Sequence, residues 1–213
     1  MRVDGAGRTD AGVHATGQLI AFTYGGWLGA EELEQALLGL LPPDVAVRDV
    51  RRVAASFDPR RAARYREYRY TVWNGPRSPL RERTALGIRV RLDVAAMGRA
   101  ASVLEGRHDF SAFGASEGQP IRTVHAIRVR RQGKVVTIDV RADAFLRGMV
   151  RRIVAVLLEV GRGKIDESDV AGALESRRPA LDGASAPARG LCLRRVVLGR
   201  RAGQHRYGDD EER

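Results

Sequence analysis

The sequence GAGRTDAGVH, residues 5–14, places two charged side chains, Arg8 and Asp10, among small residues. Glycine permits backbone angles that other residues resist, and it lets a bulky ligand approach the main chain. Such a loop can present the Asp10 carboxylate without steric cover, and the nearby Arg8 cation favours the ionised form of that carboxylate. An ionised carboxylate in a close-fitting pocket can act as a base or a nucleophile. The alternative interpretation is a glycine-rich turn that carries a solvated ion pair.

Three familiar loop types are excluded by the residues at and after Asp10. A P-loop requires Lys and then Ser or Thr after its last glycine, whereas Gly12 is followed by Val13 and His14. A dinucleotide-binding fingerprint requires a third glycine where Asp10 stands. An EF-hand loop requires alternating acidic residues that end in Glu, and this stretch has no such series. The loop therefore matches none of these phosphate-, dinucleotide- or calcium-binding sites.

The whole chain is strongly basic because it is rich in arginine. Its 213 residues include 37 basic and 26 acidic side chains, which gives a formal net charge of +11, and only Lys134 and Lys164 are lysines. Arginine makes forked contacts to phosphate and stacks on bases. A basic excess of this size favours a polyanionic partner, with nucleic acid as the first candidate. The alternative is a genome-wide preference for arginine codons, although that preference replaces lysine without creating excess charge.

The single cysteine, Cys192, excludes a disulfide framework and a zinc site built from several cysteines. It also argues against a zinc-dependent base deaminase, because that chemistry needs a Cys-x-x-Cys pair. No apolar run reaches the length of a membrane span, and no signal peptide opens the chain. We therefore expect a cytoplasmic protein that has neither a metal nor a membrane partner.

Local patterns in the first third of the chain predict two strands and a helix. Residues 18–24 are typical of a short strand, and residues 31–41 repeat apolar side chains at helical spacing before Pro42-Pro43. The valines between residues 45 and 53 predict a further strand. Residues 57–66 are basic and irregular. They predict a connector that faces RNA or, alternatively, a solvated loop.

Residues 67–74 alternate between two faces, which predicts a strand. Tyr68, Tyr70 and Val72 share one face, and Arg69 lies on the other. Tyrosines beside arginines can stack a base and hold a phosphate. The alternative is that the tyrosines are half-buried core residues.

The rest of the chain predicts an α+β protein with a central, largely antiparallel sheet flanked by helices and with two related halves. The expected elements are a strand over residues 86–92, a helix capped by Asp93 and ended by Gly106, an extended segment from His108, a hairpin of residues 121–131 and 135–141, a buried helix over residues 144–160, a shorter helix capped by Asp166 and a last strand over residues 190–198.

The predicted helix over residues 144–160 contains Arg147 and Arg151, which are four residues apart and so share a face. A buried helix tolerates an arginine where a carboxylate or a phosphate satisfies it. Arg151 is therefore a candidate partner for Asp10 or for RNA. The alternative is that both arginines are solvated on an exposed edge.

Several of these stretches together resemble a known family. Residues 5–18, GAGRTDAGVHATGQ, are similar to the catalytic motif of the tRNA pseudouridine synthase A family. The similarity continues in the family's order through Tyr68-Arg69-Tyr70, Gly106-x-His108-Asp109-Phe110, Ala144-Phe145-Leu146-x-x-Met149-Val150-Arg151 and Ala186-Pro187-x-x-Gly190-Leu191. The resemblance therefore covers nearly the whole chain, and it implies a pseudouridine synthase fold.

The resemblance also implies four catalytic residues. Asp10 would be the nucleophile that attacks the target uridine. Arg8 would pair with Asp10 and help the base to leave the stack. Tyr68 would stack on the target base and is the candidate general base, and Arg151 would hold the Asp10 carboxylate in place.

Further implications concern the substrate. Tyr68, Leu191, Arg147 and His14 are the expected substrate-binding residues, with Leu191 as a wall of the pocket. The reaction would turn uridine into pseudouridine in the tRNA anticodon stem-loop, at positions 38 to 40, without a metal or an organic cofactor. Members of the family act as homodimers, so a second copy of the chain is an expected partner.

Members of the family carry a first strand and helix before the glycine-rich motif, and we expect this chain to lack them. On this view residues 1–55 form a shortened N-terminal half, residues 56–199 form the C-terminal half, and residues 200–213 form a disordered tail. A catalytically inactive tRNA-binding protein or fragment is therefore the alternative function. A nucleoside or glycoside hydrolase would need a second carboxylate as its acid, and none lies in a comparable motif.

Overall fold

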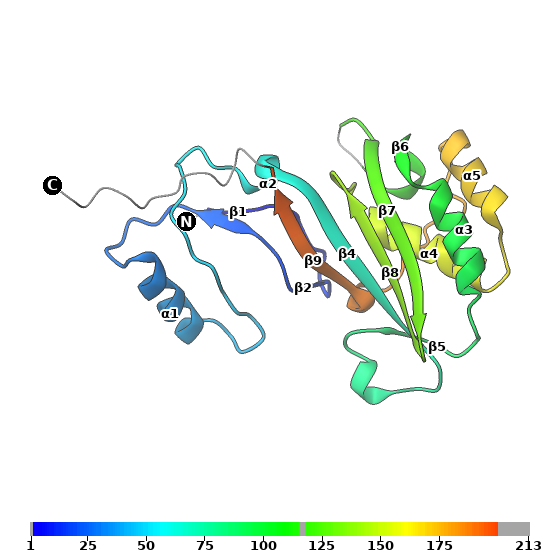
Figure 1. Ribbon diagram of the computed structural model, residues 1–213, viewed down its shortest axis with the longest axis horizontal. Helices are drawn as coiled ribbons and strands as arrows, with labels where there is room; N and C mark the ends of the chain where they lie inside the picture. The colour runs from blue at the N-terminus through cyan, green and yellow to red at the C-terminus, as the bar shows by residue number, and fades with distance from the viewer. Residues whose placement is uncertain (1, 116–117, 200–213) are drawn as a thin grey trace.

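The computed structural model describes residues 2–115 and 118–199, and its centre is a large mixed sheet (Figure 1). In these residues the sheet has seven strands in the order β2-β9-β4-β8-β7-β6, with β5 beside β4. The strands are β2 (His14–Ala15), β4 (Ala63–Asn74), β5 (Leu86–Ile88), β6 (Gly106–Asp109), β7 (Ile121–Gln132), β8 (Val135–Ala142) and β9 (Leu191–Leu198). The β2–β9 and β4–β5 pairs are parallel and the other pairs are antiparallel. The expected α+β class with a largely antiparallel sheet is therefore confirmed.

Strand β4 is the longest strand beside the site, and its two faces differ in burial as the alternation predicts. Tyr68, Tyr70 and Val72 are buried, whereas Arg69 is only partly covered. The strand pairs with β8 on one side and with β9 on the other, so it is fully enclosed in the sheet. The predicted hairpin is also confirmed, because β7 and β8 are joined at Gly133, whose positive φ of 58° suits a tight turn.

Three helices, α3 (Val94–Val103), α4 (Met149–Gly161) and α5 (Glu167–Ser176), gather on one side of the sheet (Figure 1). Two of the expected N-caps are present. The Asp93 carboxylate accepts a hydrogen bond from Ala96 N at 2.9 Å, and the Asp166 carboxylate accepts from the first turn of α5. These side chains satisfy backbone donors that have no partner inside the helix.

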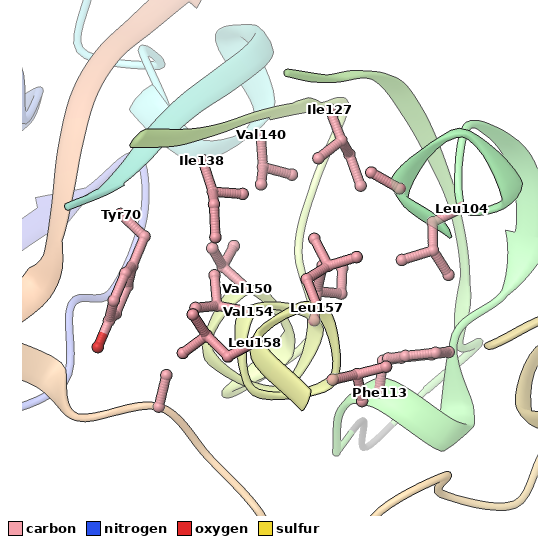
Figure 2. Close-up of a cluster of buried hydrophobic side chains, with 14 of the residues drawn as sticks. Tyr70, Leu104, Phe113, Ile127, Ile138, Val140, Val150, Val154, Leu157 and Leu158 are labelled. Atoms are coloured by element: carbon pink, nitrogen blue, oxygen red, sulfur yellow. The ribbon is translucent and has the colours of Figure 1, made fainter. Parts of the chain in front are cut away.

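The core lies between α4 and the sheet, as Figure 2 shows. Val150, Val154 and Leu157 of α4 are directed toward the buried side chains of the sheet, among them Tyr70 and Ile138. Burial of one such apolar side chain contributes roughly 1.5–3 kcal/mol. The packing therefore holds α4 against the middle of β4 and thereby places Arg151, on the first turn of α4, near one edge of the core.

The helix predicted over residues 144–160 begins later than expected. Helix α4 starts at Met149, because Gly148 before it has a φ of 74° in the left-handed region, which a continuing helix cannot use. Arg147 instead forms an isolated antiparallel bridge with Ala115. The prediction that Arg147 and Arg151 share a helix face is therefore wrong.

Two further local predictions are also wrong. The valines between residues 45 and 53 form no strand; Val45 and Val53 are exposed, and Val50 N donates to the Glu34 carboxylate at 2.9 Å. The basic connector predicted over residues 57–66 is a short helix, α2 (Pro59–Ala62), followed by the first residues of β4. Local capping favours α2, because the Asp58 carboxylate accepts from Arg60 N and Arg61 N at 2.8 and 3.1 Å and Pro59 suits the first helical turn.

The region that carries the glycine-rich loop has little core of its own. It contains β1 (Val3–Gly5), β3 (Ile20–Phe22), which pairs with β1, and α1 (Ala30–Leu40), close to the helix predicted over residues 31–41. Ala6 is the one buried residue among residues 2–55, and strand β2 joins this region to β9 of the large sheet. No helix among the described residues is long and apolar enough to cross a membrane. The predicted tail over residues 200–213 lies outside the described residues.

Candidate active site

The glycine-rich loop connects β1 to β2 and is held by main-chain and amide contacts. Ala6 N donates to Leu19 O at 2.9 Å, and the Gln18 side-chain amide donates to Gly7 O at 2.8 Å. Val13 N donates to Asp10 O at 3.0 Å, which closes a turn. Gly12 sits in this turn with a φ of 81°, so the turn requires the freedom of glycine. The loop presents Asp10 with 42% of its side-chain surface exposed.

Arg151 reaches the Asp10 carboxylate from the first turn of α4. Its Nη1 lies 2.8 Å from Asp10 Oδ2, and its Nε donates to Ala186 O at 2.7 Å. Ala186 N in turn donates to Arg151 O at 3.0 Å. The guanidinium is thus fixed on both sides, and the structure brings together the two residues whose pairing the sequence predicts.

The expected ion pair between Arg8 and Asp10 is not present. Arg8 is exposed, and within residues 2–115 and 118–199 it has neither a hydrogen bond nor an ion pair. Although Arg8 lies only two positions from Asp10, the Asp10 carboxylate is directed toward Arg151 of α4. Arg151, and not Arg8, is therefore the counter-ion of Asp10. The Arg8 side chain is exposed on the glycine-rich loop.

Tyr68 lies beneath the glycine-rich loop. It is 8% exposed, and its ring packs edge-on against Phe145 with a centroid distance of 5.1 Å. A Cβ added to Gly7 would lie 3.5 Å from the Tyr68 hydroxyl oxygen. Burial raises the pKa of Tyr68 to about 12, an effect that the Arg66 charge opposes and the Asp10 charge adds to. Tyr68 is therefore a neutral phenol at neutral pH, and the charge of Asp10 contributes to its raised pKa.

Leu191 is buried at the start of β9, opposite Tyr70 of β4. The segment before it is pinned to the sheet, because the Tyr70 hydroxyl donates to Pro187 O at 2.9 Å. Gly190 allows this approach, since a Cβ there would lie 2.6 Å from the Tyr70 ring. Tyr70 therefore helps to place the segment that supplies Ala186 to Arg151 and Leu191 to the sheet.

The other two predicted substrate-binding residues are exposed and make their backbone contacts elsewhere: His14 pairs with Cys192 and Arg147 bridges to Ala115. His14 is exposed on β2, and its Nε2 lies 2.8 Å from Arg83 O. Arg147 is exposed before α4. In the described part of the chain neither side chain forms a hydrogen bond or an ion pair with Asp10 or Arg151.

Sequence reasoning missed Arg66, which is the most buried arginine of the site, with 6% of its surface exposed. Its Nε and Nη2 donate to Ala6 O, at 3.1 and 2.7 Å, in the glycine-rich loop. Desolvation by burial lowers the pKa of its guanidinium. The signal that could have found it is the alternation of β4, since position 66 falls on the same face as Tyr68 and Tyr70.

This arrangement suits nucleophilic chemistry at a carboxylate. Arg151 holds one oxygen of Asp10, and among the described residues the other oxygen has no hydrogen-bond partner. The neutral phenol of Tyr68 lies within electrostatic range of the Asp10 carboxylate. The same residues contain no cluster of three or more His, Cys, Asp or Glu side chains that could hold a metal ion. An oriented carboxylate with one free oxygen can attack an electrophilic carbon, with the phenol as a nearby hydrogen-bonding group.

The sequence is similar to those of known proteins along nearly its whole length. A family model described as tRNA pseudouridine synthase matches residues 100–197. The tRNA pseudouridine synthase A of Geotalea uraniireducens is 42% identical over 197 residues, which are 91% of this chain and 81% of that protein. The protein of the same name from Myxococcus xanthus is 46% identical over 201 residues, covering 92% of this chain and 76% of the relative. That of Geobacter sulfurreducens is 40% identical over 200 residues, with coverages of 92% and 82%. With this extent of similarity along nearly the whole chain, the protein belongs to the tRNA pseudouridine synthase A family.

Proposed function

We propose that this protein converts uridine to pseudouridine in tRNA and that Asp10 is the nucleophile. The observation that carries the proposal is the 2.8 Å ion pair between Arg151 and Asp10, which orients a carboxylate on an otherwise small-residue loop. The names of its relatives support the reaction type. The resemblance of residues 5–18 to the family's catalytic motif supports the assignment of Asp10.

The proposed reaction is an isomerisation and needs no oxidant or reductant. Asp10 bonds to C1′ of the target uridine as the bond between N1 of the base and C1′ breaks, and the base turns. C5 then bonds to C1′ as the bond between Asp10 and C1′ breaks, which frees the carboxylate. C5 loses its proton and N1 gains one. Tyr68 is the candidate group for the C5 proton. Because its hydroxyl is neutral, it would pass its own proton to the freed Asp10 carboxylate as it receives the proton from C5.

A uridine in a structured stem must leave the base stack before Asp10 can reach it. Arg8, which is exposed on the glycine-rich loop, would help the base to leave the stack. Leu191 would form a wall of the pocket. His14 and Arg147 would bind outer parts of the RNA. The net charge of +11 supports a phosphate-rich partner.

The finer proposal is that the substrate is the anticodon stem-loop, at positions 38 to 40, and that the protein acts as a homodimer in the cytoplasm without a cofactor. These assignments rest on the resemblance to the family. Replacing uridine by cytidine at those three positions of a tRNA tests the first of them. Release of the C5 hydrogen should then disappear, and unchanged release would place the target elsewhere.

Tritium release from tRNA labelled at C5 of uracil tests the activity itself. The intact chain should release tritium and Asp10→Ala should not, while both should bind tRNA with an affinity that falls as salt rises. Equal release from both proteins would exclude Asp10 as the nucleophile. Salt-dependent binding without release from the intact chain would favour the alternative, a tRNA-binding protein without catalysis.

A further inference from the structure

A buried arginine without a carboxylate partner lies beneath the glycine-rich loop. Arg66 is 6% exposed, and no carboxylate of the described residues lies within ion-pair distance of it. A buried charge is costly unless its donors are satisfied. Here main-chain carbonyl groups satisfy them. The acceptors are Ala6 O at 3.1 and 2.7 Å, Arg60 O at 2.7 Å, Asp143 O at 2.6 Å and, more weakly, Ala63 O at 3.5 Å.

The first of these acceptors lies in the loop that carries Asp10. Ala6 is the one buried residue among residues 2–55, so this region has little apolar packing to hold it against the sheet. After Asp10, the chain is anchored by β2, where Thr16 N donates to Leu193 O at 2.9 Å. Before Asp10, the two hydrogen bonds from Arg66 are the corresponding anchor. The position of the Asp10 carboxylate therefore depends on the Arg66 guanidinium.

The acceptor on Asp143 belongs to the turn that leads into α4. The Asp143 carboxylate accepts from Thr123 N at 3.1 Å and from Ala144 N at 2.6 Å, which fixes this turn. The next residue, Phe145, packs against the Tyr68 ring, and α4 follows with Arg151. Arg66 itself lies two residues before Tyr68 on the same face of β4. One side chain thus contacts the loop of Asp10, the strand of Tyr68 and the turn before the helix of Arg151.

We propose that Arg66 is a positioning residue. Its forked guanidinium fixes the loop of Asp10 in the place where the Asp10 carboxylate can act together with Tyr68 and Arg151. The inference rests on the proposed function, because it assumes that these three residues act on one substrate. Lysine cannot replace the fork, since its single ammonium group cannot reach three separate carbonyls in this planar geometry. Arg66 is buried beneath the loop, so it acts through Asp10 and not on the substrate directly.

Single-turnover tritium release, with enzyme in excess over C5-labelled tRNA, tests this role in Arg66→Lys. The release rate constant should fall by about tenfold to hundredfold, the size of loss that a displacement of roughly 1 Å in a catalytic group produces. The Kd for tRNA should change far less. Arg128→Lys is the matched control, because Arg128 lies on β7, not beside the glycine-rich loop, and is paired with Glu105 at 2.8 Å. It should keep the wild-type rate.

A second variant separates positioning from a general loss of folding. In Arg66→Ala, millimolar ethylguanidinium should raise the release rate by filling the vacated space, whereas urea at the same concentration should not. Circular dichroism at the assay temperature gives the folded fraction of each variant. Wild-type release from Arg66→Lys would overturn the inference, and so would a loss that matches its unfolded fraction or an equal loss of tRNA binding. If Arg66→Ala does not fold, Arg66→Lys alone decides.

The two proposals fail in different ways. If Asp10→Ala releases tritium as fast as the intact chain, or if the intact chain releases none, the proposed function is wrong. If Asp10→Ala is inactive while Arg66→Lys is fully active, the proposed function stands and the positioning role of Arg66 is wrong.

Discussion

Arg151 Nη1 lies 2.8 Å from Asp10 Oδ2, although the two residues are separated by 141 positions in the chain. The same guanidinium donates to Ala186 O, so the arginine is oriented before any substrate is present. An oriented cation holds one oxygen of the carboxylate and leaves the other available. This relationship supports the proposal that Asp10 is the nucleophile, and it defines the first test of the site.

We expect Arg151→Lys to lower the rate of tritium release by about tenfold to hundredfold, because an ammonium group cannot bind Asp10 and Ala186 in the same fork. The free energy of unfolding should fall by less than about 1 kcal/mol for the ion pair itself, since Asp10 is partly exposed and the pair is screened by solvent. Single-turnover assays and urea denaturation measure the two effects. Arg162→Lys, at the far end of α4, is the control and should leave the rate unchanged. A large loss of stability with no loss of rate would contradict the role of Arg151.

Removal of the Tyr68 hydroxyl should affect turnover more than tRNA binding. The ring of Tyr68→Phe can still pack against Phe145, so stacking is kept while the proton acceptor is lost. We expect a fall of about 10²-fold or more in release, the usual contribution of a general base or acid. Tyr65→Phe, on the opposite face of β4, should have the wild-type rate because its aromatic contacts with His125 and Arg141 do not need the hydroxyl. A parallel fall in tRNA affinity and rate for Tyr68→Phe would show that the hydroxyl serves binding.

The raised pKa of Tyr68 predicts a loss of stability at alkaline pH. An unfolded tyrosine loses its proton near the ordinary pKa of 10, while burial keeps the folded residue protonated up to about 12. The folded state therefore binds more protons than the unfolded state between these values, and the free energy of unfolding falls as pH rises through this window. At about 1.4 kcal/mol for each pKa unit, the fall is roughly 2–3 kcal/mol.

Urea denaturation at a series of pH values from neutral to about 12 measures this slope. Tyr68→Phe should show a smaller fall than the intact protein, and the part that remains includes Tyr70, whose pKa burial also raises. Identical slopes for the two proteins would mean that Tyr68 titrates alike in the folded and unfolded states.

Gly190→Ala should destabilise the wall of the site. An added Cβ would lie 2.6 Å from the Tyr70 ring, inside van der Waals contact, so the ring or the segment from residue 186 must move. We expect a cost of about 1–3 kcal/mol, typical of overpacking. Gly172→Ala is the matched control, because Gly172 lies in the exposed interior of α5 with nothing within 4 Å of the new Cβ. That change should stabilise by up to about 1 kcal/mol, since alanine favours the helix. Thermal unfolding distinguishes the two, and equal midpoints would contradict the argument.

Elements with a strong local signal were predictable from the chain alone. The Asp93 and Asp166 caps, the hairpin at Gly133 and the alternation of β4 each depend on residues a few positions apart, and the structure has them all. The start of α4 was not predictable in this way. Its apolar period extends back to residue 144, but the left-handed Gly148 and the bridge from Arg147 to Ala115 interrupt the helix, and the bridge joins distant segments.

The candidate site also has a part that was predictable from the sequence and a part that was not. The resemblance to the family's motifs implies that Asp10, Tyr68 and Arg151 act together. Residue types alone indicate a carboxylate at Asp10 and make Arg151 a candidate partner for it. The counter-ion of Asp10 was predicted partly as Arg8, its near neighbour, and the structure selects Arg151 instead. The buried position of Arg66 was not predicted, because an arginine is expected at the surface unless buried acceptors for its guanidinium are known.

Amino-acid order alone therefore specifies a candidate carboxylate, the basic charge, the helix caps and the strands with a clear alternation, since these follow from chemical identity and short-range geometry. The meeting of the Asp10 loop with α4 and β4 depends on long-range packing. Buried contacts such as those of Arg66 with Ala6 and Asp143 join segments that are 60 and 77 positions apart. Chain folding brings such carbonyl groups around one guanidinium, and no local pattern encodes that convergence.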